Sequence, residues 1–162
     1  MGSIPTAKQL SCHTCLISSK VEHCFDIADA ADRYRYEIPQ GIIMYWGYHL
    51  MLDCSDCDRD QLKSKSNIYN FVKTLVERID MVAHGEPVIE FLCPGDPSKE
   101  GYSLMQLITT SSITGHFIDY DRHIYLDVFS CKTYDIETVK NTVEEFFGSK
   151  KIRVNFITRN AG

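Results

Sequence analysis

The segment from residue 103 to residue 130 constrains the fold most, because three short strand-like stretches follow one another there with only short links between them. Residues 103–110, 113–118 and 124–130 each have the length and the rich content of apolar and β-branched residues typical of a strand. The polar residues 119–123 form the longer of the two links. Links this short join antiparallel neighbours, whereas parallel strands need a crossover of a dozen residues or more. The segment therefore predicts three consecutive antiparallel strands.

The flanking segments predict two helices and three further strands. Residues 41–53, 88–93 and 152–158 are rich in apolar residues or alternate like strands. One helix is expected after Ser66, a residue type suited to an N-cap, and a second between Asp135 and Gly148. Their apolar residues recur at three- and four-residue steps, at Ile68, Phe71, Val72, Leu75 and Ile79 in the first and at Ile136, Val139, Val143 and Phe146 or Phe147 in the second.

This order of elements predicts an α+β fold. Strands joined by short connections favour a mainly antiparallel sheet with the helices on one face, a two-layer α/β sandwich. We expect residues 41–162 to form this one domain and residues 1–40 to be an N-terminal extension of unknown role. Within the extension, residues 27–34 favour a short helix, and residues 39–41 (Pro-Gln-Gly) favour a break.

Charge and hydropathy argue against two classes of binding partner, nucleic acids and membranes. The formal net charge of -5 argues against non-specific nucleic-acid binding, which depends on clustered Lys and Arg. No apolar run approaches the roughly 18 residues that span a bilayer, and no basic segment followed by an apolar core marks a secretory signal. We therefore expect a cytoplasmic protein that binds neither nucleic acid nor membranes.

The cysteines favour free thiols over a disulfide framework or a metal site. Seven cysteines are an odd number, so they cannot all pair with one another. Two C-x-x-C units, at residues 12–15 and 54–57, offer the four thiolates that hold zinc in many small proteins. Their separation is about twice that of a zinc ribbon. We expect partly buried free thiols and no bound metal.

A serine, a histidine and a cysteine fall within the three-strand segment. Ser111 follows a Thr-Thr pair, and His116 lies five residues later. Cys131 directly follows the last strand, and Ser103 lies on the strand that enters the same region. We expect the hairpin to bring these side chains together. Taken singly, each residue is more often structural. Together, they offer a hydroxyl that can attack the preceding carbonyl, an imidazole that can move protons, and a thiol.

These residues resemble the self-processing site of the bacterial-type S-adenosylmethionine decarboxylases, which carry a covalent pyruvoyl group. Without a gap, the family pattern falls on Ser103, Ser111, His116 and on Asp127, Val128, Phe129, Ser130 and Cys131. A second match lies upstream, at Gly47-Tyr48-His49-Leu50 and at Cys57-Asp58. The resemblance covers about residues 45–150 and implies the same two-layer α/β sandwich and a homodimer.

The resemblance also implies a reaction and a role for each residue. The chain would cleave itself between Thr110 and Ser111, and Ser111 would become the pyruvoyl group that forms a Schiff base with the substrate. His116 and Ser103 would assist processing, with His116 transferring protons. Cys131 would donate a proton during decarboxylation. The substrate would be S-adenosylmethionine, and the product would be the aminopropyl donor for spermidine synthesis.

The chain departs from the family pattern around the cut and in the substrate pocket. Thr110 stands where the family has Glu, and Ser112 stands where it has His. The position that contacts ribose is Tyr120, so Asp119 and Asp121 beside it become the candidates for substrate binding. The position of the aromatic residue that stacks on adenine is Pro97, and Phe91 or Tyr102 are the possible substitutes.

These departures leave two alternatives open. One is a pyruvoyl-dependent decarboxylase of a basic amino acid, ornithine or arginine. The other is an uncleaved homologue with a regulatory or binding role.

Overall fold

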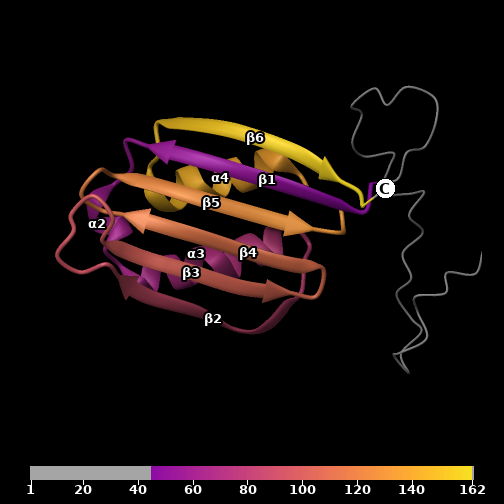
Figure 1. Cartoon of the computed structure of the whole chain (residues 1–162), viewed down its shortest axis with the longest axis horizontal. Helices are drawn as coiled ribbons and strands as arrows, with labels where there is room; N and C mark the ends of the chain where they lie inside the picture. The colour runs from indigo at the N-terminus through magenta and orange to yellow at the C-terminus, as the bar shows by residue number, and fades with distance from the viewer. Residues whose placement is uncertain (1–44, 162) are drawn as a thin grey trace, which may run out of the picture. The chain divides into compact units, whose positions relative to one another are not determined.

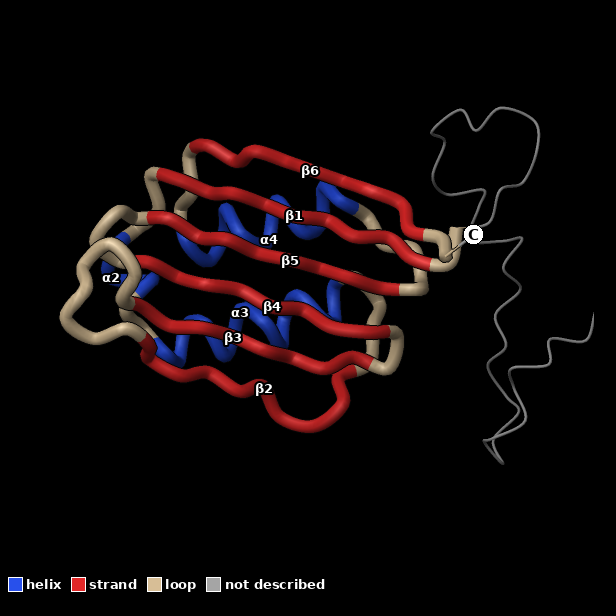
Figure 2. Tube along the Cα trace, viewed as in Figure 1, coloured by secondary structure: helices blue, strands red, loops and turns tan. Residues whose placement is uncertain are grey.

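The computed structural model describes residues 45–161, which form a six-stranded sheet and three helices. Every neighbouring pair of strands is antiparallel, in the order β2-β3-β4-β5-β1-β6. The helices cover one face of the sheet (Figures 1 and 2). In chain order the elements are β1 (Gly47–Ser55), α2 (Arg59–Leu62), α3 (Lys65–Arg78), β2 (Ala83–Leu92), β3 (Gly101–Ile108), β4 (Ser111–Ile118), β5 (His123–Ser130), α4 (Ile136–Phe147) and β6 (Lys151–Arg159). The predicted α+β sandwich is confirmed.

The core lies between the sheet and the two longer helices. Burial alternates along β5, where Ile124, Leu126 and Val128 are inaccessible to solvent while the residues between them are not. On α3 the expected apolar stripe is buried, and Phe71 packs edge-on against Phe147 with 5.0 Å between ring centroids. Burying an apolar side chain of this size contributes about 1.5–3 kcal/mol, so the shared core holds the two layers together.

The ends of α4 lie where the sequence predicted them, whereas the start of α3 does not. Asp135 caps α4 by accepting hydrogen bonds from two backbone N–H groups, and Gly148 ends the helix at a φ of 59°. The prediction that Ser66 caps α3 is wrong. Ser64 is the N-cap, because its Oγ accepts from the backbone N–H of Asn67 at 3.1 Å. Ser66 lies inside the first turn, with its hydroxyl 3.0 Å from that of Ser64.

Strand β2 begins five residues before the expected start at residue 88. Its pairing with β3 shifts between His84 and Val88, where Gly85 adopts a φ of 71° and Pro87 supplies no N–H. This irregularity hid the first part of the strand from pattern analysis. The expected helix at 27–34, the break at 39–41 and the first C-x-x-C unit lie outside the described residues. Within residues 45–161, no helix is long and apolar enough to cross a membrane.

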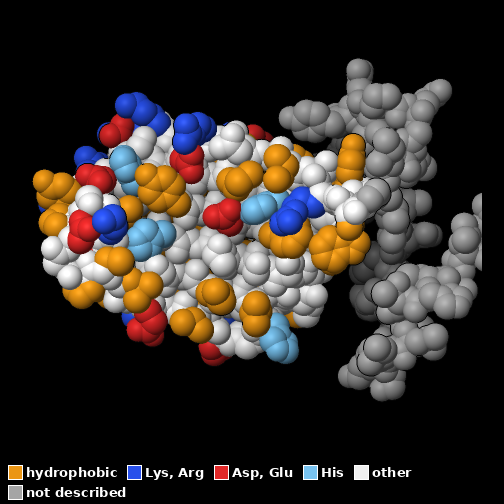
Figure 3. Space-filling model, in the orientation of Figure 1, with side chains coloured by type: hydrophobic (Ala, Val, Ile, Leu, Met, Phe, Trp, Pro, Cys, Tyr) orange, Lys and Arg blue, Asp and Glu red, His pale blue; other side chains and the backbone are white. Residues whose placement is uncertain are grey.

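The sheet face opposite the helices is uncovered in the described part of the chain. We call it the outer face. Figure 3 views it and shows apolar side chains interspersed with histidines and charged groups. Five of its apolar side chains are between 44% and 58% exposed, namely Val88, Met105, Leu107, Tyr125 and Ile157. An antiparallel sheet can present one face to water, but this one presents many apolar groups.

Candidate active site

The predicted cleavage point lies in the tight turn between β3 and β4. Ile108 pairs with Ser111, so the hairpin closes through only two residues, Thr109 and Thr110. Two-residue hairpins favour turns with positive φ at a central residue, which a β-branched threonine resists. Here the positive φ falls on Ser111, at 150°. A non-glycine residue in such a region costs on the order of 1–3 kcal/mol, so backbone strain lies next to the Thr110–Ser111 bond.

The carbonyl of the Thr110–Ser111 peptide bond accepts a hydrogen bond from Cys131, the residue that follows β5. The backbone N–H of Cys131 donates to the carbonyl oxygen of Thr110 at 3.0 Å. Ser111 pairs with Ser130, which places the start of β4 beside the end of β5. The Cys131 side chain is exposed. Ser111 and Cys131 are therefore close in the fold, and the polarised carbonyl lies between them.

Ser103 and His116 form a second pair, on the outer face. The two residues pair across β3 and β4, and the Ser103 Oγ lies 2.7 Å from the His116 Nδ1. The His116 Nε2 lies 3.0 Å from the carbonyl oxygen of Lys99. A carbonyl only accepts, so Nε2 carries a proton, and in the neutral imidazole Nδ1 then accepts from the Ser103 hydroxyl. The fold thus brings these two of the predicted site residues into contact, and their role in processing stays a prediction.

The expectation that one hairpin brings Ser111, His116 and Cys131 together is wrong. Ser111 and His116 are the first and sixth residues of β4, so their Cα atoms are about 17 Å apart at the usual strand rise. Ser111 pairs with Ile108 and Ser130, which are both buried on the helix side of the sheet. Within one chain, the imidazole therefore does not reach the cleavage point.

Two of the three candidates for substrate binding share a pocket of about 230 Å³. Phe91 packs edge-on against Tyr102 with 5.5 Å between centroids. The Asp119 carboxylate is 3.2 Å from the Lys63 Nζ and 3.5 Å from the Arg59 Nε. The other residues that line the pocket are Leu62, Glu100, Gly101 and Phe117. The contacts to Arg59 and Lys63 place Asp119 on the helix side of the sheet.

The other face holds Ser103 and His116, so the pocket and this pair open on opposite sides of the sheet. Asp121 is exposed in the β4–β5 turn and does not line the pocket. The roles of Asp119, Asp121 and Phe91 in substrate binding stay predictions.

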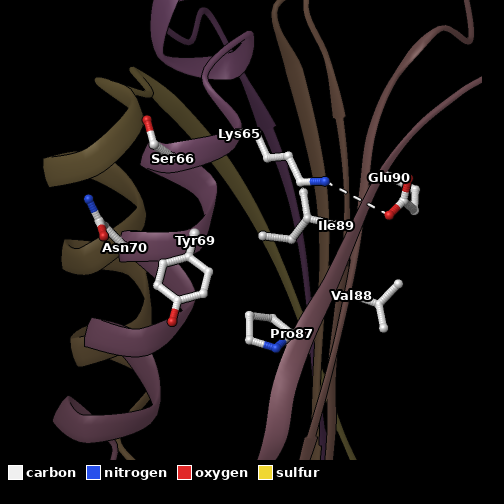
Figure 4. Close-up of a pocket in the computed structure, with 8 residues that line it drawn as sticks. All are labelled: Lys65, Ser66, Tyr69, Asn70, Pro87, Val88, Ile89 and Glu90. Atoms are coloured by element: carbon white, nitrogen blue, oxygen red, sulfur yellow. Dashed lines mark ion pairs between the residues drawn. The ribbon is translucent and has the colours of Figure 1, made fainter.

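A larger groove, of about 650 Å³, lies between α3 and β2 (Figure 4). The Lys65 Nζ and the Glu90 carboxylate face one another across it at 3.8 Å. The other lining residues are Ser66, Tyr69, Asn70, Pro87, Val88 and Ile89. None of the residues predicted to act in catalysis lines this groove.

The second C-x-x-C unit is part of the core. Cys54 and Cys57 are free and buried at the end of β1. Burial, followed by the nearby Cys57, raises the pKa of the Cys54 thiol to about 12. Burial also raises the pKa of Cys57. Both thiols are therefore protonated near neutral pH. In the described part of the chain, no group of three or more His, Cys, Asp or Glu side chains is arranged to hold a metal ion.

Two features of the site were not predicted from the sequence. The first is the backbone donor at Cys131, which no side-chain pattern can reveal. The second is a pair on the outer face, where the His49 Nε2 lies 2.9 Å from the Asp127 Oδ1. Both residues belong to the sequence matches described above, so the sequence singled out their positions but did not predict that they touch.

Comparison with known proteins places the chain in a family. The sequence model of the S-adenosylmethionine decarboxylase family matches residues 48–160. Proteins from two Clostridium botulinum strains, Langeland and Hall, are named S-adenosylmethionine decarboxylase proenzyme. Each is 29% identical over 116 residues, which are 71% of this chain and 95% of the relative.

A solved structure supports the fold. The crystal structure of the adenosylmethionine decarboxylase from Aquifex aeolicus VF5 superposes with a TM-score of 0.61 and 16% identity. The match covers 73% of this chain and 93% of that one. The family model spans well over half of the chain, and the resemblance drawn from Ser111, His116 and Cys131 is confirmed. This chain belongs to the S-adenosylmethionine decarboxylase family.

Proposed function

We propose that this protein is a proenzyme that cleaves itself between Thr110 and Ser111 and then decarboxylates S-adenosylmethionine. The observation that carries the proposal is the Thr110 carbonyl, which accepts the Cys131 N–H at 3.0 Å and adjoins the strained Ser111. Such a donor stabilises negative charge that develops on the oxygen when the carbonyl is attacked. Membership of the family supports the same reaction.

Cleavage would begin with the hydroxyl of Ser111. Its Oγ attacks the carbonyl carbon of Thr110, and the Cys131 N–H faces the resulting oxyanion. The C–N bond breaks, the Ser111 nitrogen gains a proton, and the peptide becomes an ester. Loss of the Ser111 α-proton then expels the Thr110 carboxylate and leaves dehydroalanine. Water replaces the nitrogen as ammonia, giving a pyruvoyl group at residue 111 and fragments 1–110 and 111–162.

Residues of the chain then serve the decarboxylation. A pyruvoyl group supplies a carbonyl that bonds the substrate amine and takes up the electron pair as carbon dioxide leaves. The exposed Cys131 thiol, beside the Ser111 position, would return a proton to the α-carbon of the substrate. A thiol S–H is a proton donor, which is the kind of group that this step needs. The product would be the aminopropyl donor for spermidine synthesis.

A homodimer would complete the processing site. One copy holds Ser111 and Cys131 at one end of β4 and His116 with Ser103 at the other end. If two copies pack outer face to outer face, a two-fold axis between them, perpendicular to β4 near its midpoint, would place His116 of each copy near Ser111 of its partner. The apolar side chains of the outer face supply a surface that such packing would bury. Two composite sites per dimer would result.

The substrate is tested by the release of carbon dioxide. Purified protein is incubated with carboxyl-labelled S-adenosylmethionine, ornithine or arginine, and with borohydride-treated protein as a control that lacks the reactive carbonyl. We expect turnover of S-adenosylmethionine alone. Turnover of a basic amino acid without turnover of S-adenosylmethionine would favour the second decarboxylase, and no turnover of any substrate would favour the uncleaved regulatory homologue.

A further inference from the structure

We infer that the α3–β2 loop, residues 80–82, is a positioning clamp for self-cleavage, and that Lys132 is the residue through which it holds the Cys131 N–H against the Thr110 carbonyl. The inference rests on the proposed cleavage at Thr110–Ser111. The loop touches the cleavage turn directly. It touches the donor segment through Lys132 and, more weakly, through the Ser130 hydroxyl, which donates to the Met81 Sδ at 3.8 Å. Neither the family pattern nor the sequence motifs mark these residues.

The loop first fixes the turn that carries the scissile bond. The backbone N–H of Thr109 donates to the carbonyl oxygen of Val82 at 2.9 Å. The Thr110 hydroxyl donates to the Met81 Sδ at 3.1 Å. Met81 is only 8% exposed, so its sulfur is held in the core. Two successive residues of the turn are therefore tied to two successive residues of the loop.

The loop also fixes the segment that supplies the donor. The Lys132 Nζ donates to both the carbonyl oxygen and the carboxylate of Asp80, at 2.6 Å each. The Lys132 backbone N–H donates to the Ser130 Oγ at 2.9 Å. Cys131 lies between these two anchored residues. Its N–H is therefore held where the strand ends, even though its side chain is exposed.

This arrangement closes a ring around the scissile carbonyl. The turn is tied to residues 81 and 82, the donor segment is tied to Asp80, and the donor meets the carbonyl at 3.0 Å. Reactions that depend on such alignment lose rate steeply when a group shifts by about 1 Å. The ring also resists relaxation of Ser111 from its φ of 150°.

The role is one of position rather than stability. The Asp80 carboxylate is 93% exposed and the Lys132 side chain 44% exposed. Exposed ion pairs contribute little to the free energy of folding. Removing this pair should therefore leave thermal unfolding nearly unchanged, which separates a loss of alignment from a loss of fold.

The experiment measures the donor and the cleavage separately. Lys132→Met removes the ammonium, Lys132→Arg keeps a cation, and Lys140→Met removes a comparable surface ion pair on α4. Each change is made in the full chain twice, with Ser111 and with Ser111→Ala. Residue-resolved amide exchange in the uncleavable chain reports the Cys131 N–H. The first-order appearance of fragments in the Ser111 chain, released from denaturant, reports cleavage.

We expect Lys132→Met to speed exchange of the Cys131 amide and to slow cleavage by about tenfold, less than the 10²–10³-fold cost of losing an oxyanion donor. Lys132→Arg should recover most of both effects, and Lys140→Met should change neither. Unchanged exchange in Lys132→Met would overturn the inference, as would faster exchange with an unchanged cleavage rate. If the unaltered chain does not cleave, the proposed function fails, whereas the exchange arm still decides whether Lys132 holds the donor.

Discussion

The backbone N–H of Cys131 donates to the carbonyl oxygen of Thr110 at 3.0 Å, and this bond joins the end of β5 to the turn between β3 and β4. The same residue thus offers two groups with different uses. Its N–H faces the bond that would be cut, and its thiol is free for the later step. Since the N–H belongs to the main chain, changing the side chain removes one use and keeps the other.

Cys131→Ala should therefore separate cleavage from decarboxylation. The backbone donor remains, so fragments should appear at nearly the rate of the unaltered chain. Release of carbon dioxide should fall by about 10²–10⁴-fold, the usual worth of a positioned acid or base. Both rates can be followed on one preparation, by mass spectrometry and by trapping labelled carbon dioxide. Cys93→Ala removes another exposed thiol and is the matched control. Equal decarboxylation by the Cys131→Ala and unaltered proteins would assign the proton to another group.

Ser111→Ala and His116→Ala should each abolish or severely slow cleavage alone and complement one another when mixed. In a mixed dimer, the Ser111 of one copy would meet the intact His116 of the other. We expect the His116→Ala chain, which keeps Ser111, to be cut after the two proteins are unfolded and refolded together. Refolding each variant by itself is the control. If the mixture stays uncut while the unaltered chain is cut under the same conditions, the composite dimer site is wrong.

Alkylation should distinguish the cysteines by position. Cys54 is buried with a pKa raised to about 12, whereas Cys93 is exposed. The thiolate is the reactive form, so Cys54 should be nearly inert to iodoacetamide at pH 8 in the folded protein. Its reactivity should rise as the pH approaches 12. Peptide mapping after timed alkylation reads each site, and unfolded protein gives the reference rate. Equal labelling of Cys54 and Cys93 in folded protein would contradict the buried placement of β1's end.

Tyr134→Phe should destabilise the sheet. The Tyr134 hydroxyl accepts from the Leu50 N–H at 3.2 Å and donates to the Val128 carbonyl at 2.6 Å, so it links β1 and β5 from the core. Leaving these groups without their partner should cost about 1–3 kcal/mol in the free energy of unfolding. Urea denaturation of the uncleavable chain measures the change. Tyr69→Phe, whose hydroxyl bonds Glu86 at the surface, is the control and should cost much less.

The same tyrosine sets a pH dependence. Burial raises the pKa of Tyr134 above its ordinary value. The folded state therefore favours the neutral phenol, and this contribution is fully present below the unfolded pKa of about 10 and is lost as pH rises above it. The difference in unfolding free energy between Tyr134 and Tyr134→Phe proteins should shrink in alkaline solution. A difference that grows with pH would contradict the buried, neutral assignment.

Much of the fold could be predicted from the sequence because its signals are local. The alternation in β5 and the stripe of α3 report burial directly, and Asp135 and Gly148 mark the ends of α4. The cap at Ser64 was missed because Ser66 is chemically equivalent and two residues away. The start of β2 was missed because Gly85 and Pro87 interrupt its pattern within an irregular pairing.

The sequence predicted which residues belong to the site but not how they are arranged. Pattern matching marked Ser103, Ser111, His116 and Cys131, but strand geometry decides which of them meet. Residues an odd number apart on one strand point to opposite faces, and five steps along a strand exceed any side-chain reach. That count alone would have separated Ser111 from His116. The contact of Cys131 with Thr110 is made by main-chain atoms, so the identities of the side chains do not reveal it.

Denaturing intact-mass spectrometry of freshly purified protein tests the central claim most directly. With Ser111→Ala as the uncleavable control, we predict two fragments divided between Thr110 and Ser111, the smaller one beginning with a pyruvoyl group in place of serine. Reduction with borohydride should add two mass units to that fragment alone. A single full-length mass, identical in behaviour to Ser111→Ala after prolonged incubation, would contradict self-cleavage and with it the pyruvoyl mechanism.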